Sequence, residues 1–245
     1  MPTVTIPVRL TMRTGKVPVS SQKPHYHGHR ERLRQRFAET DGNGMPDYEI
    51  LELLLALAIP RGDVKPLAKA LVDRFGSLGG VLSAEPEALI QIKGIGDSAA
   101  TALKVVRAAG LRLSRQQIAK RDVIGSWDQL LAYCKAAMGY QKIEQLRILF
   151  LDRKNVLITD EVQQQGTVDH TPLYPREVVK RALELGASAI ILVHNHPSGD
   201  PTPSRADIEM THQVKDVCEK LGIALHDHVI IGRGRHASFQ GLGLL

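Results

Sequence analysis

The chain has 245 residues, of which 43% are hydrophobic and 24% are charged, and its formal net charge is +6. This length suits one large or two modest domains, and the hydrophobic content is sufficient for an ordinary core. Two cysteines lie far apart without a CxxC pair, which argues against a disulfide framework and a cysteine zinc site. No apolar run has the length of a signal peptide or a membrane span, so we expect a cytoplasmic protein with no membrane partner.

The positive charge is concentrated in two segments. Residues 1–36 carry eight Lys/Arg and one acidic residue, a balance of +7, so the remaining residues sum to −1. Residues 98–121 carry six Lys/Arg and no acidic residue. Such segments suit a phosphate backbone or an acidic partner. A disordered leader and a solvated linker would have the same composition, and the sequence leaves both interpretations open.

The first half of the chain has a helical pattern. Residues 1–24 lack periodicity and are expected to form a disordered basic leader. The alternating His25, His27 and His29 follow, but no strand is predicted around them, so a metal site there is disfavoured. Helices are predicted over residues 30–37, 47–58 with Asp47 as the cap, 64–75, 77–81 and 86–91. The second of these is apolar nearly all round, which is typical of the central helix of a small bundle.

Residues 89–103 contain a short helix, a Gly-Ile-Gly turn and a helix of small residues. This pattern resembles the helix-hairpin-helix motif of DNA-binding proteins, in which turn amides and a helix N-terminus hold a phosphate. The candidate DNA contacts, within residues 89–115, are Lys93, Gly94, Gly96, Lys104 and Arg107. A single hairpin of this kind would contact the DNA backbone and would not read sequence. The same pattern also occurs as a structural turn or a protein contact.

A basic linker ends near residue 121, which divides the chain into a helical domain, 25–121, and a second domain, 122–245. The second domain is predicted to contain a helix over 126–138 capped by Ser126, strands over 145–151 and 156–164, a helix over 175–186, a strand over 189–193, a helix over 206–221 and a strand over 227–231. This order predicts a sheet backed by helices. The fold class of the whole chain is therefore a helical bundle followed by an α/β domain.

Two histidines directly follow the buried strand 189–193. Side chains at positions i and i+2 of a strand point to the same face, so His194 and His196 can direct two imidazoles at one point. A Pro/Gly loop then leads to Ser204 and Asp207. Two imidazoles and one carboxylate are typical of a catalytic Zn²⁺ site with water as the fourth ligand. Ser204 and Asp207 also have the spacing of a helix capping box, which is compatible with the metal interpretation.

The order His194-x-His196, seven residues, Ser204, two residues and Asp207 resembles the JAMM (MPN+) zinc metallohydrolases. The residues around it resemble the bacterial RadC family, from about Gly28 onward; the matching stretches are Tyr174-Pro175-Arg176-Glu177, residues 194–200 and Asp227-His228. The resemblance implies a JAMM/MPN sheet similar to that of cytidine deaminases, and Zn²⁺ held by His194, His196 and Asp207.

The resemblance also implies a glutamate from an earlier strand as general base. Glu144, at the head of the first strand, is the best match. Glu161 on the paired strand is its rival, because alternation alone does not separate the two. Ser204 would stabilise an oxyanion through its hydroxyl or amide. Asp227 and His228 are interpreted either as groups that support the metal ligands or as the polar start of a strand.

Three functions are consistent with these features. The first is a JAMM-type metallohydrolase that cuts an amide or isopeptide bond and is brought to DNA by the hairpin module. The second is a DNA-binding accessory protein, associated with DNA repair, whose zinc fold is structural. The third is a metal-dependent nuclease. A nucleobase deaminase is disfavoured, because it requires His-x-Glu and Pro-Cys-x-x-Cys. The sequence predicts neither the substrate, which could be a protein or peptide, nor the oligomeric state.

Overall fold

The computed structural model describes residues 26–119, 122–166 and 173–245. The predicted leader, His25 and the linker residues 120–121 lie outside the described residues. In chain order the elements are α1 (Tyr26–Thr40), α2 (Asp47–Ala58), α3 (Lys65–Phe75), α4 (Leu78–Ser83), α5 (Pro86–Ile90), α6 (Asp97–Ile118), α7 (Trp127–Met138), β1 (Glu144–Leu151), β2 (Leu157–Gly166), α8 (Pro175–Glu184), β3 (Ala189–Asn195), α9 (Arg205–Lys220), β4 (Ala224–Ile231) and β5 (His236–Ser238).

The N-terminal helices form a small bundle around α2, as its apolar sequence predicts. Helix α2 contacts α1, α3, α4 and α6, and its Leu51 and Leu55 are fully buried. Asp47 does not cap this helix, because the N-cap is Pro46 and Asp47 is the first helical residue. The carboxylate of Asp47 instead accepts a hydrogen bond of 2.7 Å from the amide of Leu78 at the start of α4.

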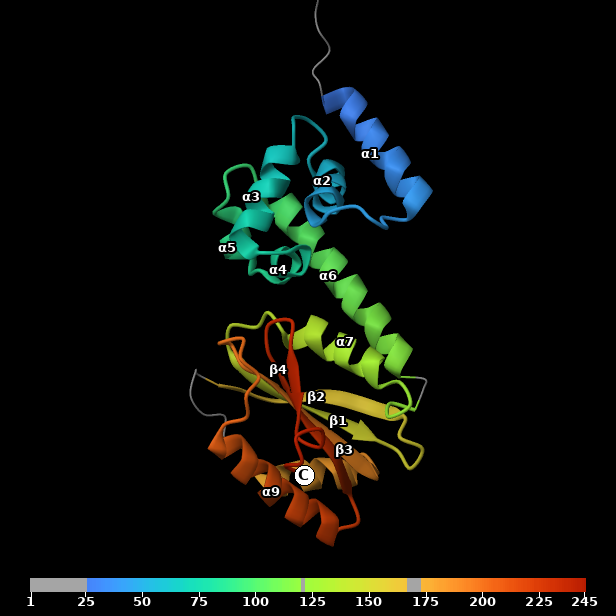
Figure 1. Ribbon diagram of the computed structural model, residues 1–245, viewed down its shortest axis with the longest axis vertical. Helices are drawn as coiled ribbons and strands as arrows, with labels where there is room; N and C mark the ends of the chain where they lie inside the picture. Colours follow the sequence, from blue (N-terminus) through green and yellow to red (C-terminus); the bar gives the residue numbers. More distant parts are fainter. Residues whose placement is uncertain (1–25, 120–121, 167–172) are drawn as a thin grey trace, which may run out of the picture.

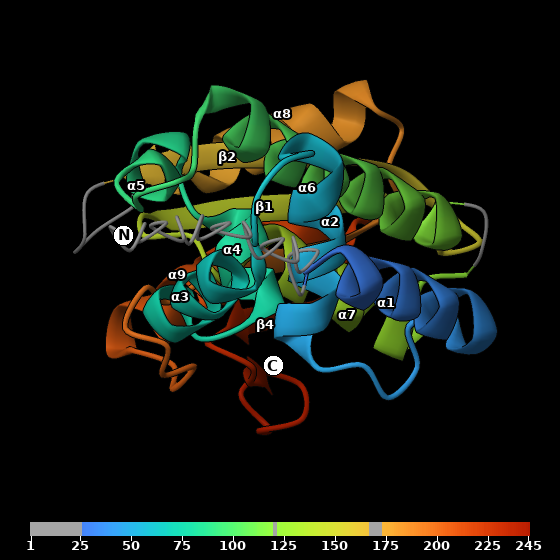
Figure 2. The ribbon, with the colours of Figure 1, turned by 90° about the horizontal axis from the view of Figure 1, so that it is seen from above.

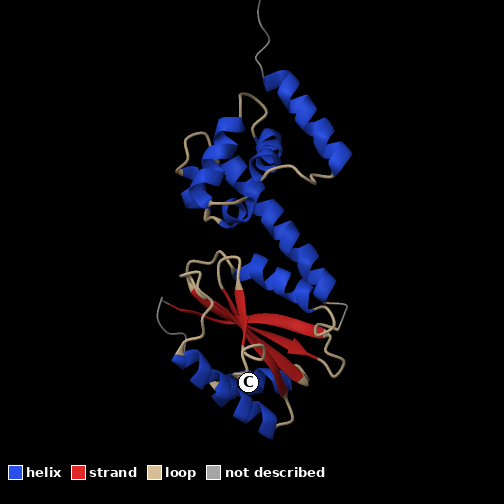
Figure 3. Ribbon diagram, viewed as in Figure 1, coloured by secondary structure: helices blue, strands red, loops and turns tan. Residues whose placement is uncertain are grey.

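The C-terminal part is a three-layer α/β/α unit around a five-stranded sheet with the order β2-β1-β3-β4-β5 (Figures 1 and 3). Strands β3 and β4 are parallel, and the other neighbouring pairs are antiparallel. Helix α7 covers one face and α8 and α9 cover the other (Figure 1). Strand β3 is buried on both faces, because its odd-numbered residues pack towards α7 and its even-numbered residues towards α8 and α9.

Two local predictions for this domain are wrong. Ser126 precedes α7 but does not cap it, because its hydroxyl donates to the carbonyl of Asp122 at 2.7 Å. The strand predicted over residues 227–231 is longer in the structure, where β4 spans Ala224–Ile231. The three-residue strand β5 was not predicted. Strand β5 forms its hydrogen bonds with the edge of β4, and its three residues are too few to show a strand pattern in the sequence.

Helix α6 connects the two parts of the molecule. It begins in the N-terminal bundle and ends beside α7, and the view from above shows the bundle lying over the sheet (Figures 1 and 2). Arg107 of α6 donates to the carbonyl of Ala137 in α7 at 3.3 Å, and Arg115 bonds Asp160 of β2 at 2.6 Å. The hydroxyl groups of Ser77 and Tyr140 form a further bond between the two parts at 3.1 Å.

Candidate metal centre

The candidate metal ligands lie at the carboxyl ends of the parallel strands β3 and β4, where α/β sheets commonly bind ligands. His194 is the penultimate residue of β3, and only 2% of its side chain is exposed. His196 follows the end of the strand, and its amide bonds the carbonyl of Ile231 in β4 at 3.0 Å. This bond extends the strand pairing by one step, so that both imidazoles share a face as predicted.

Three donor atoms converge at this point. Nε2 of His194 lies 2.9 Å from Nε2 of His196. The carboxylate oxygens of Asp207 lie 3.4 Å from the first nitrogen and 3.5 Å from the second. Among the described residues this is the group of histidine, cysteine and acidic side chains close enough to share one metal ion. The structure thus brings together the predicted ligand set from β3, its following loop and α9.

Asp207 is held by the predicted capping box of α9. The hydroxyl of Ser204 accepts from the amide of Asp207 at 3.1 Å, and the Ser204 amide and hydroxyl each donate to Oδ2 of Asp207 at 2.7 Å. Burial opposes ionisation, but hydrogen bonds from His196 and Ser204 and the neighbouring His194 hold the pKa of Asp207 far below its usual value. Asp207 is therefore an ionised carboxylate with a fixed orientation, as a metal ligand requires.

The loop between the two histidines and α9 packs closely against the β4–β5 turn. The amide of Arg233 donates to the carbonyl of Gly199 at 3.1 Å. A Cβ atom added at Gly232 would lie 2.5 Å from that same carbonyl oxygen, so glycine is required for this approach. The contact fixes the Pro/Gly loop, and through it the distance between the histidines and Asp207.

The two histidines have different surroundings. Nδ1 of His194 lies 2.7 Å from Nε2 of the buried His228, whose Nδ1 lies 2.6 Å from the hydroxyl of Thr211. Burial lowers the pKa of His194 to about 4, and it also lowers the pKa of His228. Both rings are therefore neutral at neutral pH.

His196 is only half-buried, and its Nδ1 lies 2.8 Å from the carbonyl oxygen of Asp200. The hydrogen bond to Asp207 raises the pKa of His196; burial opposes this, and the carbonyl of Asp200 and the charges of Asp207 and Glu144 reinforce it. Without a metal, these contacts favour the protonated form of His196.

The two candidate bases differ in position. Leu146 of β1 pairs with His194, so Glu144, two residues earlier, continues the same face towards His196, whose pKa it helps to raise. Glu161 of β2 pairs with Ile148 and accepts two hydrogen bonds from Arg181, of 2.9 and 2.6 Å, which lower its pKa. The surroundings of Glu144 therefore favour it over Glu161 as the base.

Asn195 was not identified from the sequence as a functional residue, yet it holds the start of β1. Its Oδ1 accepts from the amide of Gln145 at 3.0 Å, and its Nδ2 donates to the carbonyls of Ile143 and Gln141 at 3.2 and 3.4 Å. These bonds surround Glu144 in the chain, so Asn195 positions the candidate base. In the sequence, its position between His194 and His196 was the feature that could have identified it.

Asp227 does not contact the metal cluster. Its carboxylate accepts hydrogen bonds from the amides of His228 and Gln240 and from the hydroxyl of Ser238. It therefore joins β4 to the segment that contains β5. Of the two residues left open by the sequence, His228 contacts the candidate ligand His194, whereas Asp227 supports the fold.

A cleft of about 580 Å³ separates the bundle from the loops of the metal centre. One wall contains Arg74 and Ser77 from the α3–α4 region, and the other contains Lys142, Pro197 and Arg233. Pro197 directly follows the candidate ligand His196, so the cleft lies beside the candidate metal centre. A substrate that entered it would contact both parts of the molecule.

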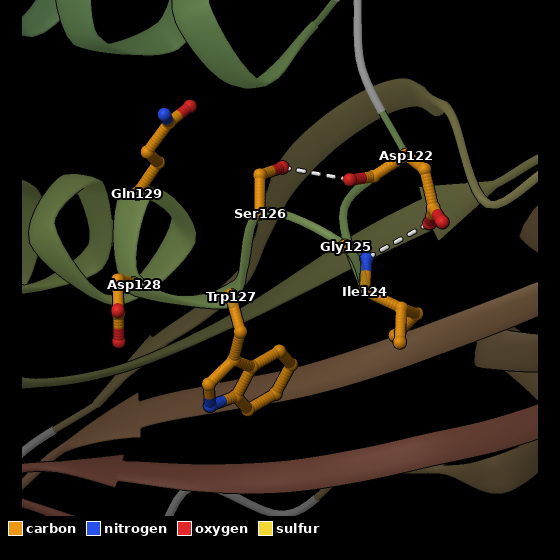
Figure 4. A pocket seen from close by; sticks show the side chains of 7 residues that line it. All are labelled: Asp122, Ile124, Gly125, Ser126, Trp127, Asp128 and Gln129. Carbon is orange, nitrogen blue, oxygen red and sulfur yellow. Dashed lines mark hydrogen bonds between the residues drawn. The ribbon is translucent and has the colours of Figure 1, made fainter.

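A second cavity, of about 520 Å³, lies at the start of α7 and is lined by residues from Asp122 to Gln129 (Figure 4). Asp122 organises this loop, since its carboxylate accepts from the amide of Ile124 and its carbonyl accepts from Ser126. Asp122 also bridges to Val156, near the pair formed by Leu151 and the first residue of β3. The cavity therefore lies at the opposite end of β3 from His194.

The candidate DNA contacts fall into two groups. Lys93 and Gly94 are exposed in the turn before α6, and Gly96 is the N-cap of that helix. Lys104 instead donates to the carbonyls of Leu82 and Ala84, at 3.5 and 2.9 Å. Arg107 bonds Ser83 and Ala137. The structure therefore uses the last two cations for internal contacts, and the DNA contact stays a prediction.

Residues 124–244 match the family model described as the RadC-like JAB domain. The match covers α7 to β5 and contains the three candidate ligands and Glu144, while the N-terminal bundle lies outside it. In the part of the chain that the structure describes, no helix combines the length and apolar character needed to cross a membrane.

Proposed function

This chain is a RadC family protein with an MPN/JAB domain, and we propose that it is a zinc-dependent hydrolase of the JAMM type that cleaves an amide or isopeptide bond. The observation that carries the proposal is the convergence of two imidazole nitrogens and one ionised carboxylate at the strand ends. This cluster lies beside a cleft that a substrate chain could enter.

The donor set fits zinc. Two neutral imidazoles and one carboxylate from His194, His196 and Asp207 would provide three ligands and leave a fourth position for water. Zinc at this site would act as a Lewis acid that activates water at neutral pH. The capping box holds Asp207 in place before any metal binds, which reduces the reorganisation that binding requires.

The protein groups supply the proton transfers. Glu144 would accept a proton from water and deliver it to the leaving amine, as a general base and then a general acid. Asn195 would keep this glutamate at the head of β1. The hydroxyl of Ser204 is bonded to Asp207, so it would have to leave Asp207 in order to donate to an oxyanion.

The charge of the cleft supports a second candidate function, a metal-dependent nuclease. Arg74, Lys142 and Arg233 line the cleft and could contact phosphates, whereas Asp73 and Glu85 on the same walls oppose an all-anionic substrate. The mixed charge is better matched by a polypeptide, and we therefore place peptide or isopeptide cleavage first.

The test combines zinc content with cleavage of a panel of peptides, isopeptides and DNA. We expect Glu144→Gln to retain zinc and to lower kcat by at least about 100-fold, since proton transfer contributes that much or more. Glu161→Gln is the matched control and is expected to change kcat by less than about threefold. A Glu144→Gln protein with full hydrolysis would exclude Glu144 as the base.

The substrate panel separates the three functions. Cleavage of DNA alone would favour the nuclease, and zinc binding without any cleavage would favour a structural zinc fold.

A further inference from the structure

We propose that Thr211 and His228 are positioning residues that fix the proton arrangement of His194 and leave its Nε2 atom free to bind the metal. Thr211 lies on α9 and His228 on β4, and both are fully buried. Thr211 lies outside the sequence stretches that indicate the metal site, and for His228 the sequence left open whether it supports a ligand or only begins a strand. The inference rests on the proposed function, because it takes His194 as a ligand of the metal.

The direction of the hydrogen bonds is set at Thr211. Its hydroxyl oxygen lies 2.5 Å from the carbonyl oxygen of Asp207, one turn earlier in α9. A carbonyl carries no hydrogen, and two oxygens approach this closely only with a proton between them, so the hydroxyl proton points at Asp207. The same hydroxyl oxygen lies 2.6 Å from Nδ1 of His228. Because its only proton is already used, the Thr211 oxygen must accept a hydrogen bond from Nδ1–H of His228.

The ring of His228 then determines which ring nitrogen of His194 carries the proton. A buried neutral imidazole has one N–H and one lone pair. With its proton on Nδ1, His228 has its lone pair on Nε2, which lies 2.7 Å from Nδ1 of His194. Nδ1 of His194 must therefore donate. The lone pair of His194 is then on Nε2, the atom that faces His196 and Asp207.

The reverse arrangement would block the site. If Thr211 donated to His228, each proton would move to the other ring nitrogen, and His194 would direct an N–H at the metal position. The ring of His228 stacks on Phe239, with centroids 4.5 Å apart, and this packing opposes rotation of the ring. His196 does not depend on such a chain of hydrogen bonds, because the carbonyl of Asp200 accepts directly from its Nδ1.

The first test measures Zn²⁺ affinity of the full-length, metal-stripped chain by competition with a chelator. Thr211→Val keeps the shape of the side chain and removes the hydroxyl, and Thr211→Ser is the matched control that retains it. The outer partners of ligand histidines typically contribute about 10–100-fold to metal affinity, so we expect a loss of that size for Thr211→Val and less than about threefold for Thr211→Ser. His228→Leu is expected to lose at least as much as Thr211→Val, and circular dichroism checks the folding of each variant.

The second test needs no metal. The ¹⁵N chemical shifts of the histidine rings in the metal-free wild type should show His194 protonated at Nδ1 and unprotonated at Nε2. Protonation at Nε2 would overturn the proposal, as would folded Thr211→Val and His228→Leu proteins with wild-type Zn²⁺ affinity. A wild type that binds no Zn²⁺ would overturn the premise that His194 is a ligand. Lack of hydrolysis would count against the proposed enzyme alone, because neither measurement depends on turnover.

Discussion

At the scale of single residues, Asn195 connects β3, the strand that carries His194, to the candidate base Glu144. Its amide makes three hydrogen bonds to the backbone at the start of β1, and Glu144 lies within that segment. We expect Asn195→Ala to lower kcat by more than about tenfold while changing zinc affinity by less than about threefold, because Glu144 moves and the ligands do not. The unpaired backbone groups should cost about 1–3 kcal/mol of unfolding free energy. Unchanged turnover in the folded variant would contradict this role.

The pKa of His196 predicts how metal affinity depends on pH. The metal must displace a proton from Nε2 of His196, and Asp207 raises the pKa of this ring above its usual value of 6.5. Affinity should therefore fall about tenfold per pH unit as the pH drops below the raised pKa of His196, and should level off above it. His194, with a pKa of about 4, adds a further loss only near that pH. Chelator competition between about pH 5 and 8 measures this slope, and a flat profile would contradict the assignment.

At the scale of secondary-structure elements, a buried carboxylate joins α6, α7, β1 and β2. Asp160 of β2 accepts hydrogen bonds from Arg115 at 2.6 Å, from Tyr133 at 2.5 Å and from Arg147. Only 2% of its side chain is exposed. Burial alone would raise the pKa of Asp160, but Tyr133, Arg147 and Arg115 together hold it below its usual value.

We expect Asp160→Asn to lower the unfolding free energy by about 3 kcal/mol, because it leaves the cation of Arg147 without its charged partner. Glu161→Gln, the adjacent change at a partly exposed ion pair, should cost less than about 1 kcal/mol. Urea denaturation of both variants measures the difference. The depressed pKa also means that the contribution of Asp160 is present above its usual pKa of 3.8 and is lost as the pH falls through the lowered value. Equal destabilisation by the two changes would contradict this explanation.

At the scale of the whole molecule, several basic side chains of the described residues make internal contacts. Arg30 donates to the carbonyls of Ile59, Pro60 and Gly62, and Arg36 pairs with Glu49. Lys104, Arg107 and Arg115 make the internal contacts described above. These five cations count toward the net charge of +6, but they would have to break internal contacts in order to bind a nucleic acid.

If the turn before α6 contacts DNA, Lys93 is its main exposed cation. We expect Lys93→Glu to weaken non-specific DNA binding and to reduce the slope of log affinity against log salt by about 1. Arg153→Glu, an equal charge change in the exposed β1–β2 turn, is the control and should have the smaller effect. Fluorescence anisotropy over a range of salt concentrations measures both. Equal effects of the two substitutions would show that binding follows net charge and does not use the turn.

The sequence by itself determined the strand that carries the histidines, the capping box that holds Asp207 and the three candidate ligands. The spacings of two residues between the histidines and of three between Ser204 and Asp207 follow from the local geometry of a strand and of a helix start. The eleven residues from His196 to Asp207 cross a loop, whose contact with the β4–β5 turn is tertiary. The central place of α2 in its bundle was also visible, because a helix that is apolar nearly all round favours a position among other helices.

Only the tertiary structure decided which distant groups meet the metal ligands. Thr211 and His228 are 17 residues apart, and Asn195 and Gln145 are 50 apart. Alternation placed Glu144 and Glu161 on comparable faces, and two tertiary features distinguish them. The pairing of β1 with β3 directs Glu144 towards His196, and Arg181 of α8 folds against β2 and pairs with Glu161. The internal contacts of Lys104 and Arg107 were likewise not predictable from the sequence. No local periodicity specifies such pairs, because they form only when strand order and helix packing bring separate elements together.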